Sequence, residues 1–274
     1  MSTEELEDLI DFIYRKTGIR FETKKLYYIS KRVEKRIKEM GMATTSQYIR
    51  YLRFSDPNGK EFQSLVNLLT VNETYFFRDF PQLQAFAEHS LQEVIERKSK
   101  KGDYHLRVWS AGCASGEEPY TIAIILLEMI EDIKHWHLEI IGSDIDVHIL
   151  KKADTSIYEL RSMRDVPHEY LDKYFHKLTH ETYTVKKIVK DIVKFEHLNL
   201  SDKKGLREKT GFDFIFCRNV LIYFDDISRK QIVDHFYTAL NTGGFIFLGS
   251  SESVARISPA FKIKRSGDFL VYHK

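Results

Sequence analysis

Cysteine, proline and net charge are all scarce in this chain. It has two cysteines, five prolines and a formal net charge of +2 over 274 residues. Because Cys113 and Cys217 lie far apart, we predict neither a disulfide framework nor a Cys-x-x-Cys site, and we expect reduced thiols in the cytoplasm. A net charge near zero excludes a bulk polycation, so any acidic partner must meet a local basic patch.

Long apolar runs and a targeting signal are also missing. The longest apolar stretch, residues 122–129, is interrupted by Glu128 and is too short to cross a bilayer, so we expect no membrane insertion. Residues 1–5 are polar and acidic, unlike a signal peptide. Hydrophobic residues make up 43% of the chain, which is enough for a globular core in one or two domains.

The first hundred residues carry apolar side chains at helical spacing. Ser2 and Glu5 predict a capping box at the start of the first helix, and Gly18 predicts its end. Further helices are expected at 26–40, near 48–52, at 62–69 and after the proline at 81. We therefore predict an all-α N-terminal domain over residues 1–80.

The pattern changes after residue 100 to an alternation of strands and helices. Strands are predicted at 106–109, 138–142, 212–216, 245–248 and 269–272. Helices are predicted between them at 120–133, 147–153 and 228–240, the last with a Ser228-x-x-Gln231 capping box. This alternation is typical of an α/β domain with a mostly parallel sheet, here over residues 81–274.

One segment of this domain departs from the alternation. β-branched residues alternate over residues 182–192, which predicts a small antiparallel β-insert at about 176–197. The sequence of residues 187–194 also fits a helix, so the pattern leaves both structures open.

The strongest local pattern is a predicted strand that runs through a glycine turn into a helix. Gly112 lets the backbone approach a ligand closely, and the helix begins with Glu117 and Glu118. Two carboxylates repel a phosphate and attract a cation, so S-adenosylmethionine, with its ammonium and sulfonium groups, fits this turn better than NAD. An ordinary tight turn, with acidic residues that favour the helix dipole, is the alternative.

Polar residues also follow two other predicted strands. Asp144 is the better candidate for binding ribose hydroxyls, and Asp146 the better candidate for capping the next helix. Arg218 and Asn219 end a buried strand, and a short apolar turn then presents Tyr223. Ligands of open α/β sheets bind beyond the carboxyl ends of strands, so these residues are candidates for one site. A strand-end cap and a core tyrosine are the alternatives.

The segment that joins the helical region to the sheet region alternates polar side chains with aromatics. Asn72, Thr74 and Arg78 are its polar members, whereas Phe76 and Phe77 are expected to be buried. Histidines and cysteines show no ligand spacing with a carboxylate, so we predict no metal site.

Five segments taken in order resemble the CheR family, S-adenosylmethionine-dependent methyltransferases that esterify glutamates on chemoreceptors. They are residues 70–79, 108–120, 143–146, 199–200 and 217–224. The resemblance covers nearly the whole chain. It implies a helical N-terminal domain, a Rossmann-like methyltransferase sheet with a small antiparallel β-subdomain, and a cofactor between the two domains. We expect a cytoplasmic monomer.

The resemblance also implies which residues contact S-adenosylmethionine or its product, S-adenosylhomocysteine. By matching position they are Asn72, Thr74, Arg78, Glu118, Asp144, Asn199, Leu200, Arg218 and Asn219. Gly112 joins them from its place in the turn. Tyr223 matches a family tyrosine near the transferred methyl, and we expect Arg78 and Tyr223 to orient the glutamate carboxylate. Arg78 is equally a candidate cofactor contact.

A basic helix is the predicted docking surface for the receptor. Between residues 24 and 38 the chain has seven basic residues and one acid. Those expected near one face are Lys25, Arg32, Lys35 and Arg36. The resemblance implies a partner, the acidic cytoplasmic helical bundle of a methyl-accepting chemoreceptor, and opposite charge would steer its docking. A solvated helix face is the alternative.

The resemblance has one departure. Family members that dock on a receptor C-terminal pentapeptide have a longer, glycine-bearing hairpin loop in the β-subdomain, whereas residues 175–183 lack glycine. We therefore expect an enzyme that does not depend on the pentapeptide.

Two other classes of function compete with this interpretation. A nucleic-acid methyltransferase could use the basic helix for phosphates, but the chain has no Asn-Pro-Pro-Tyr-like motif for a flipped base, so we expect no nucleic-acid partner. A catalytically silent sensor of S-adenosylmethionine, or a methyltransferase acting on another protein, stays open. The presence of Arg78 and Tyr223 argues against a silent sensor, which would not need them.

Overall fold

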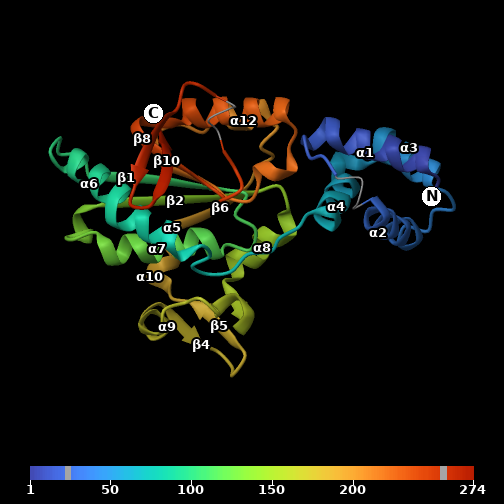
Figure 1. Ribbon diagram of the computed structural model, residues 1–274. Coiled ribbons are helices and arrows are strands. Elements are labelled where there is room, and N and C mark those ends of the chain that lie inside the picture. The colour runs from blue at the N-terminus through green and yellow to red at the C-terminus, as the bar shows by residue number, and fades with distance from the viewer. Residues whose placement is uncertain (22–25, 254–257) are drawn as a thin grey trace.

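The computed structural model describes residues 1–21, 26–253 and 258–274. Its N-terminal part consists of helices, blue to teal in Figure 1. They are α1 (Thr3–Thr17), α2 (Leu26–Glu39), α3 (Thr45–Phe54), the 3-10 turn η2 (Pro57–Gly59) and α4 (Lys60–Leu69). Ser2 and Glu5 form the predicted capping box, and Gly18 ends α1 in the left-handed conformation. The prediction for this helix is confirmed at both ends.

The four helices bury their apolar faces against one another. Leu9, Val33, Tyr48 and Leu65 are fully buried in this core. Burying an apolar side chain of this size contributes about 1.5–3 kcal/mol to stability, so the helical part has a core of its own.

The main sheet occupies the rest of the chain. Its strands are β1 (His105–Ala111), β2 (His137–Asp144), β6 (Val193–His197), β7 (Phe212–Cys217), β8 (Leu240–Leu248), β9 (Lys262–Ser266) and β10 (Phe269–His273). Among the described residues their order is β6-β2-β1-β7-β8-β10-β9. The first five are parallel, and β10 and β9 are antiparallel. The strand order reverses between β1 and β7, which is where ligands bind in open α/β sheets.

Helices cover both faces of this sheet (Figure 1). They are α5 (Phe80–Ala85), the π-helical turn η3 (Phe86–Leu91), α6 (Gln92–Ser99), α7 (Glu117–Met129), η4 (Ile133–His135), α8 (Val147–Thr155), α11 (Lys203–Arg207), η6 (Leu221–Tyr223) and α12 (Asp226–Ala239). On one face Phe86 packs edge-on against Phe214 and Phe216 of β7. On the other, Trp109 of β1 packs edge-on against Phe236 of α12. No helix in the described ranges is both long and apolar enough to span a membrane.

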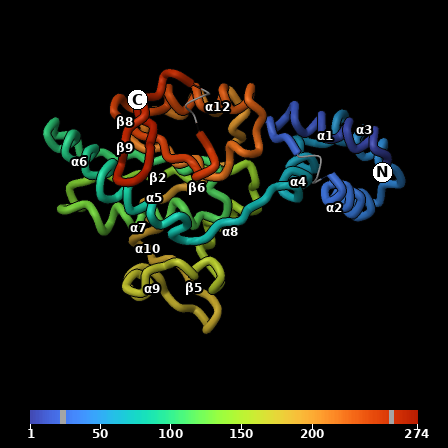
Figure 2. The backbone as a smooth tube through the Cα atoms, in the orientation of Figure 1, coloured from blue at the N-terminus to red at the C-terminus, as the bar shows by residue number. Residues whose placement is uncertain are grey.

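A small antiparallel sheet projects from the main sheet, yellow in Figures 1 and 2. Its strands are ordered β3-β5-β4. The elements of this region are β3 (Ile157–Glu159), η5 (Leu160–Met163), α9 (His168–Tyr174), β4 (Phe175–Lys177), β5 (Thr182–Val185) and α10 (Lys187–Lys190). The small sheet therefore starts earlier in the chain than the predicted insert at 176–197, and it also ends earlier, at Val185.

The predicted insert is wrong at its C-terminal end because two different structures follow β5. The Lys-Ile-Val-Lys sequence at 187–190 forms the short helix α10, with Val189 fully buried. Strand β6 then pairs in parallel with β2 and belongs to the main sheet. Short apolar runs fit either period, and packing against the rest of the molecule decides between them.

The helical part contacts the loops that follow the parallel strands. The side chains of Asn199 and Ser201, after β6, donate hydrogen bonds to the carbonyls of Lys16 and Thr17 at the end of α1. On α4, Gln63 donates to the Ile145 carbonyl, just after β2. The helical part thus lies over the carboxyl ends of the strands.

Candidate functional site

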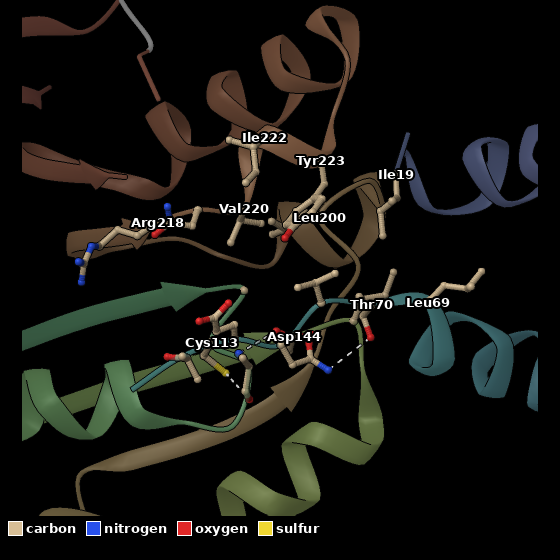
Figure 3. Close-up of a pocket in the computed structure, with 18 of the residues that line it drawn as sticks. Ile19, Leu69, Thr70, Cys113, Asp144, Leu200, Arg218, Val220, Ile222 and Tyr223 are labelled. Carbon is tan, nitrogen blue, oxygen red and sulfur yellow. Dashed lines mark hydrogen bonds between the residues drawn. The ribbon is translucent and has the colours of Figure 1, made fainter. Parts of the chain in front are cut away.

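A cavity of about 550 Å³ lies between the helical part and the carboxyl ends of β1, β2, β6 and β7. This volume is in the usual range for a small-molecule site. Figure 3 shows Val220, Ile222 and Tyr223 on one side of it and Cys113 and Asp144 on the other. Helices α1, α2 and α4 close the cavity with apolar side chains.

The structure brings the candidate cofactor and catalytic residues together, although they come from five separate segments. Those that line the cavity are Asn72, Thr74, Arg78, Gly112, Glu118, Asp144, Asn199, Leu200, Arg218, Asn219 and Tyr223. Of the basic-helix candidates, Arg32 also reaches the lining. Lys25 lies outside the described residues.

The glycine turn is held against strand β2. The amides of Gly112 and Cys113 both donate to the Ser143 carbonyl, at 2.7 and 3.0 Å. Gly112 has a φ of 78°, and a Cβ placed there would lie 2.4 Å from Cγ2 of Val220. Only glycine can therefore occupy this position with the loop after β7 in place.

Glu118 lies on the first turn of α7 with its carboxylate at the cavity wall. It accepts hydrogen bonds from Ser110 at 2.7 Å and from Arg218 at 3.3 Å. Burial raises the pKa of the Glu118 carboxyl, and the positive charge of Arg218 opposes that rise. A carboxylate in this position can accept hydrogen bonds from a ligand ammonium.

Asp144 ends β2 and is 8% exposed. One carboxylate oxygen accepts from the Ala114 amide at 2.8 Å, the other from the Asp146 amide at 2.9 Å. Burial raises the pKa of Asp144, and these amides oppose the rise. Each oxygen keeps a second lone pair, so Asp144 can still accept from ribose hydroxyls.

Asp146 caps helix α8, as the sequence predicts. Its side chain accepts from the amides of His148 and Ile149. It also accepts from the Asn72 side-chain amide at 2.8 Å and from the Thr70 hydroxyl at 2.9 Å. Asn72 therefore joins the linker, the segment between the helical part and the sheet, to the residues just after β2. It also lines the cavity.

Tyr223 lies across the cavity from Asp144 (Figure 3), and Arg78 lines the cavity close enough for its charge to act on both Tyr223 and Glu118. The Arg78 guanidinium donates to the Glu73 carbonyl at 3.1 Å and lies 5.8 Å from the ring centre of Tyr75. Tyr223 is half-buried, and burial raises the pKa of its phenol. The phenol therefore stays protonated at neutral pH and can donate a hydrogen bond.

Two buried polar atoms at the cavity have no protein partner among the described residues. They are Nε of Arg218 and Oδ1 of Asn219. The other nitrogens of the Arg218 guanidinium are used, since Nη2 bonds the Arg78 carbonyl and the Asp79 carboxylate. Leaving a buried polar atom unsatisfied costs about 1–3 kcal/mol, so both atoms need a polar partner, which a ligand or a water molecule in the cavity can supply.

The basic helix α2 does not present its candidate residues on one solvent-facing surface. Arg36 forms a two-pronged ion pair with Glu61 of α4, at 2.8 and 2.6 Å, and Glu61 is 5% exposed. A buried carboxylate needs a charged partner, so Arg36 has a structural role, whereas its expected role in docking stays a prediction. Lys35 is exposed, and Arg32 donates to the Leu68 carbonyl.

One residue that holds a loop of the site was missed from the sequence. Glu252 lies in the turn after β8, where its carboxylate binds the loop that carries Asn219 and Tyr223. A carboxylate just after a strand was the signal that singled out Asp144, and it could have identified Glu252 too.

The fold and this cavity define the class. A parallel sheet whose order reverses at a glycine turn, with Glu118 at the start of the next helix and Asp144 at the end of the next strand, is the arrangement of an α/β enzyme that binds a nucleotide-like cofactor at the carboxyl ends of its strands. The family model described as CheR methyltransferase, all-alpha domain, matches residues 4–70. The model described as CheR methyltransferase, SAM binding domain, matches residues 72–268.

Full-length relatives agree with these matches. Chemotaxis protein methyltransferase 2 of Vibrio cholerae is 42% identical over 264 residues, covering 96% of this chain and 90% of the relative. Chemotaxis protein methyltransferases of Borreliella burgdorferi and Escherichia coli are 34% and 31% identical, covering 93% and 96% of this chain and 89% of each relative. The chain therefore belongs to the CheR methyltransferase family, which confirms the predicted family.

Proposed function

We propose that this protein methylates glutamate side-chain carboxylates on chemoreceptors and so forms methyl esters. The observation that carries the proposal is that one cavity combines two sets of residues, which we call the cofactor wall (Glu118 and Asp144) and the acceptor wall (Arg78 and Tyr223). The cofactor wall suits a cationic, ribose-bearing cofactor, and the acceptor wall suits a carboxylate. The names of the relatives support a substrate in chemotaxis.

The residues present fit S-adenosylmethionine. Glu118 can accept from its ammonium group, Asp144 from its ribose hydroxyls, and the free Nε of Arg218 can donate to its carboxylate. Leu200 and the apolar side chains of the helical part suit the purine. When bound, the cofactor supplies a methyl group already activated on a positively charged sulfur. We propose S-adenosylhomocysteine as the product and no metal.

The protein's own residues act on the acceptor by placement. A glutamate carboxylate is ionised at pH 7, so no general base has to activate it. The Arg78 guanidinium can pair with one carboxylate oxygen while the protonated Tyr223 phenol donates to it or to the other. Holding the carboxylate in line, in a site shielded from water, is where the rate gain arises.

The receptor meets the enzyme, in this proposal, through the basic side of α2. Exposed Lys31 and Lys35 lie on this helix, and Arg32 reaches from it to the cavity wall. Such a surface attracts an acidic helical bundle. The β4–β5 connection is short, residues 178–181, which supports action without a receptor pentapeptide. We further propose a cytoplasmic monomer.

The test is transfer of labelled methyl from S-adenosylmethionine to a chemoreceptor cytoplasmic fragment, scored as label that alkali releases. Alkali-labile label on glutamate-containing peptides is the expected result. Calorimetric binding of the cofactor without transfer to any receptor fragment would instead indicate a silent sensor. Alkali-stable label on the fragment would show a methyltransferase with a different acceptor group.

A further inference from the structure

Four backbone amides converge on the side chain of Glu252. Its Oε2 accepts from the amides of Asn219 and Gly249, at 2.8 and 2.7 Å. Its Oε1 accepts from the amides of Val220 and Ile222, at 3.0 and 3.2 Å. One carboxylate thus joins the turn after β8 to the loop after β7.

The amides use the whole hydrogen-bonding capacity of this carboxylate. An ionised carboxylate has about four lone-pair sites, and four amide donors occupy them. Glu252 therefore has no capacity left to bind a ligand. Its effect on the cavity must pass through the loop that it holds.

The held loop contains a left-handed residue and is closely fitted to the cavity. Asn219 has a φ of 59°, in the left-handed region that few non-glycine residues adopt. Its Oδ1 is one of the two unpartnered buried atoms at the cavity. Val220 packs directly against the Gly112 turn, so a small shift of the loop would disturb the opposite wall.

The approach of the two loops also depends on Gly249. A Cβ at this position would lie 2.8 Å from Oε2 of Glu252 and 2.9 Å from the Asn219 amide nitrogen. Glu252 thus fits between the two loops only because Gly249, three residues earlier, has no side chain.

A second contact fixes the far end of the same loop. The Tyr223 carbonyl accepts from the Arg20 amide at 2.8 Å, and Ile19 forms a bridge with Phe224. With Glu252 at the start and the helical part at the end, both limits of the segment 219–223 are held.

We propose that Glu252 is a positioning residue: it fixes the 219–223 loop so that the Asn219 side chain and the Tyr223 phenol face the cavity. The structural part of this proposal stands on the hydrogen bonds alone. Its consequence for methyl transfer rests on the proposed function.

The test is Glu252→Gln, which keeps the shape of the side chain but turns one acceptor into a donor that faces amide hydrogens. Hydrogen–deuterium exchange of the peptide 218–224 is expected to quicken by about tenfold or more. The turnover number is expected to fall about 100-fold, as for a misplaced reacting group. S-adenosylhomocysteine affinity is expected to fall less than tenfold, since Glu118 and Asp144 are held by groups outside this loop.

Three comparisons make the test specific. Glu131→Gln, an exposed carboxylate outside the cavity lining, is the matched control and is expected to change neither exchange nor turnover. Gly249→Ala, which crowds the carboxylate without removing it, is expected to reproduce the Glu252→Gln pattern. Combined with Tyr223→Phe, Glu252→Gln is expected to cost less than the product of the two single effects, because both act through the same loop.

Unchanged exchange of 218–224 in Glu252→Gln would overturn the proposal, as would losses that multiply in the double variant. A turnover loss that only follows the folded fraction, with a lowered unfolding midpoint, would reduce Glu252 to a structural residue. If the unaltered enzyme methylates no receptor, the proposed function fails, and the exchange experiment still decides whether Glu252 holds the loop.

Discussion

The two walls of the cavity are built in different ways. On the cofactor wall, Asp144 and Glu118 lie at the end of a strand and the start of a helix, and amides or a serine hydroxyl hold their carboxylates. On the acceptor wall, Arg78 and Tyr223 lie on a linker and a 3-10 turn, and Arg78 is held by one backbone carbonyl. Binding of the cofactor and placement of the acceptor should therefore respond to different mutations.

The largest effect that would separate the walls is expected for Arg78→Ala. Loss of the guanidinium should lower the turnover number about 100- to 1,000-fold, the usual cost of removing one preorganised charged donor. The S-adenosylhomocysteine dissociation constant should change only a few-fold. The matched control is Arg164→Ala, because Arg164 lies over the same Tyr75 ring, 3.6 Å from its centre, but outside the cavity lining. Full activity in Arg78→Ala would remove it from the acceptor wall.

The converse prediction concerns Glu118→Gln on the cofactor wall. Replacing a charged acceptor for the ligand ammonium should weaken cofactor binding about 10- to 100-fold, from about 1.5–3 kcal/mol for such a hydrogen bond. Calorimetric titration measures this directly. Glu128→Gln is the control on the same helix, since Glu128 binds Lys173 and Tyr174 instead. Equal affinity in Glu118→Gln would contradict the assigned role of the cofactor wall.

The pH dependence of binding sharpens the same contrast. Burial raises the pKa of Glu118 and of Asp144, so each takes up a proton at a higher pH than an exposed carboxyl does. The ionised forms are the ones that accept from the ligand, so cofactor affinity should fall as the pH drops toward these raised values. Titrations across the acidic range should show a weaker fall in Glu118→Gln. A cofactor affinity that rises on acidification would contradict the proposed role of the ionised carboxylates.

The smallest expected effect is a loss of stability in Arg36→Ala, without any change in cofactor binding. Arg36→Ala leaves the buried Glu61 without its cation and should lower the free energy of unfolding by about 1–3 kcal/mol. Thermal unfolding should show this loss, whereas Lys35→Ala, at an exposed neighbour, should change stability by less than about 0.5 kcal/mol. Cofactor affinity should not change in either variant. A docking defect in Arg36→Ala without a stability loss would restore Arg36 to the receptor surface.

The sequence predicted most of the fold because its signals are local. The Ser2–Glu5 capping box, the main strands and the Asp146 cap depend on neighbours within a few residues. Even so, helix α12 begins at Asp226 with Asp225 as its cap, and the Ser228 amide donates to Asp225. The predicted Ser228–Gln231 box is wrong because an earlier carboxylate takes the capping position.

The residues that line the candidate site could be predicted from the sequence, but the contacts that hold them in place could not. Residues at strand ends meet because parallel strands share one carboxyl edge, so Gly112, Asp144 and Arg218 were found together. The pairing of Arg36 with Glu61 and the binding of the 219–223 loop by Glu252 are contacts across 25 residues or more. No periodicity or spacing records such contacts.

The most direct test of the two-wall account is a crystal structure with S-adenosylhomocysteine bound. The account predicts the ligand in this cavity, with its ammonium at Glu118, its ribose at Asp144, and Nε of Arg218 and Oδ1 of Asn219 each gaining a polar partner. Arg78 and Tyr223 should stay free of the ligand and face its sulfur. A ligand bound elsewhere, or a ligand that covers Arg78 and leaves Glu118 and Asp144 untouched, would contradict it.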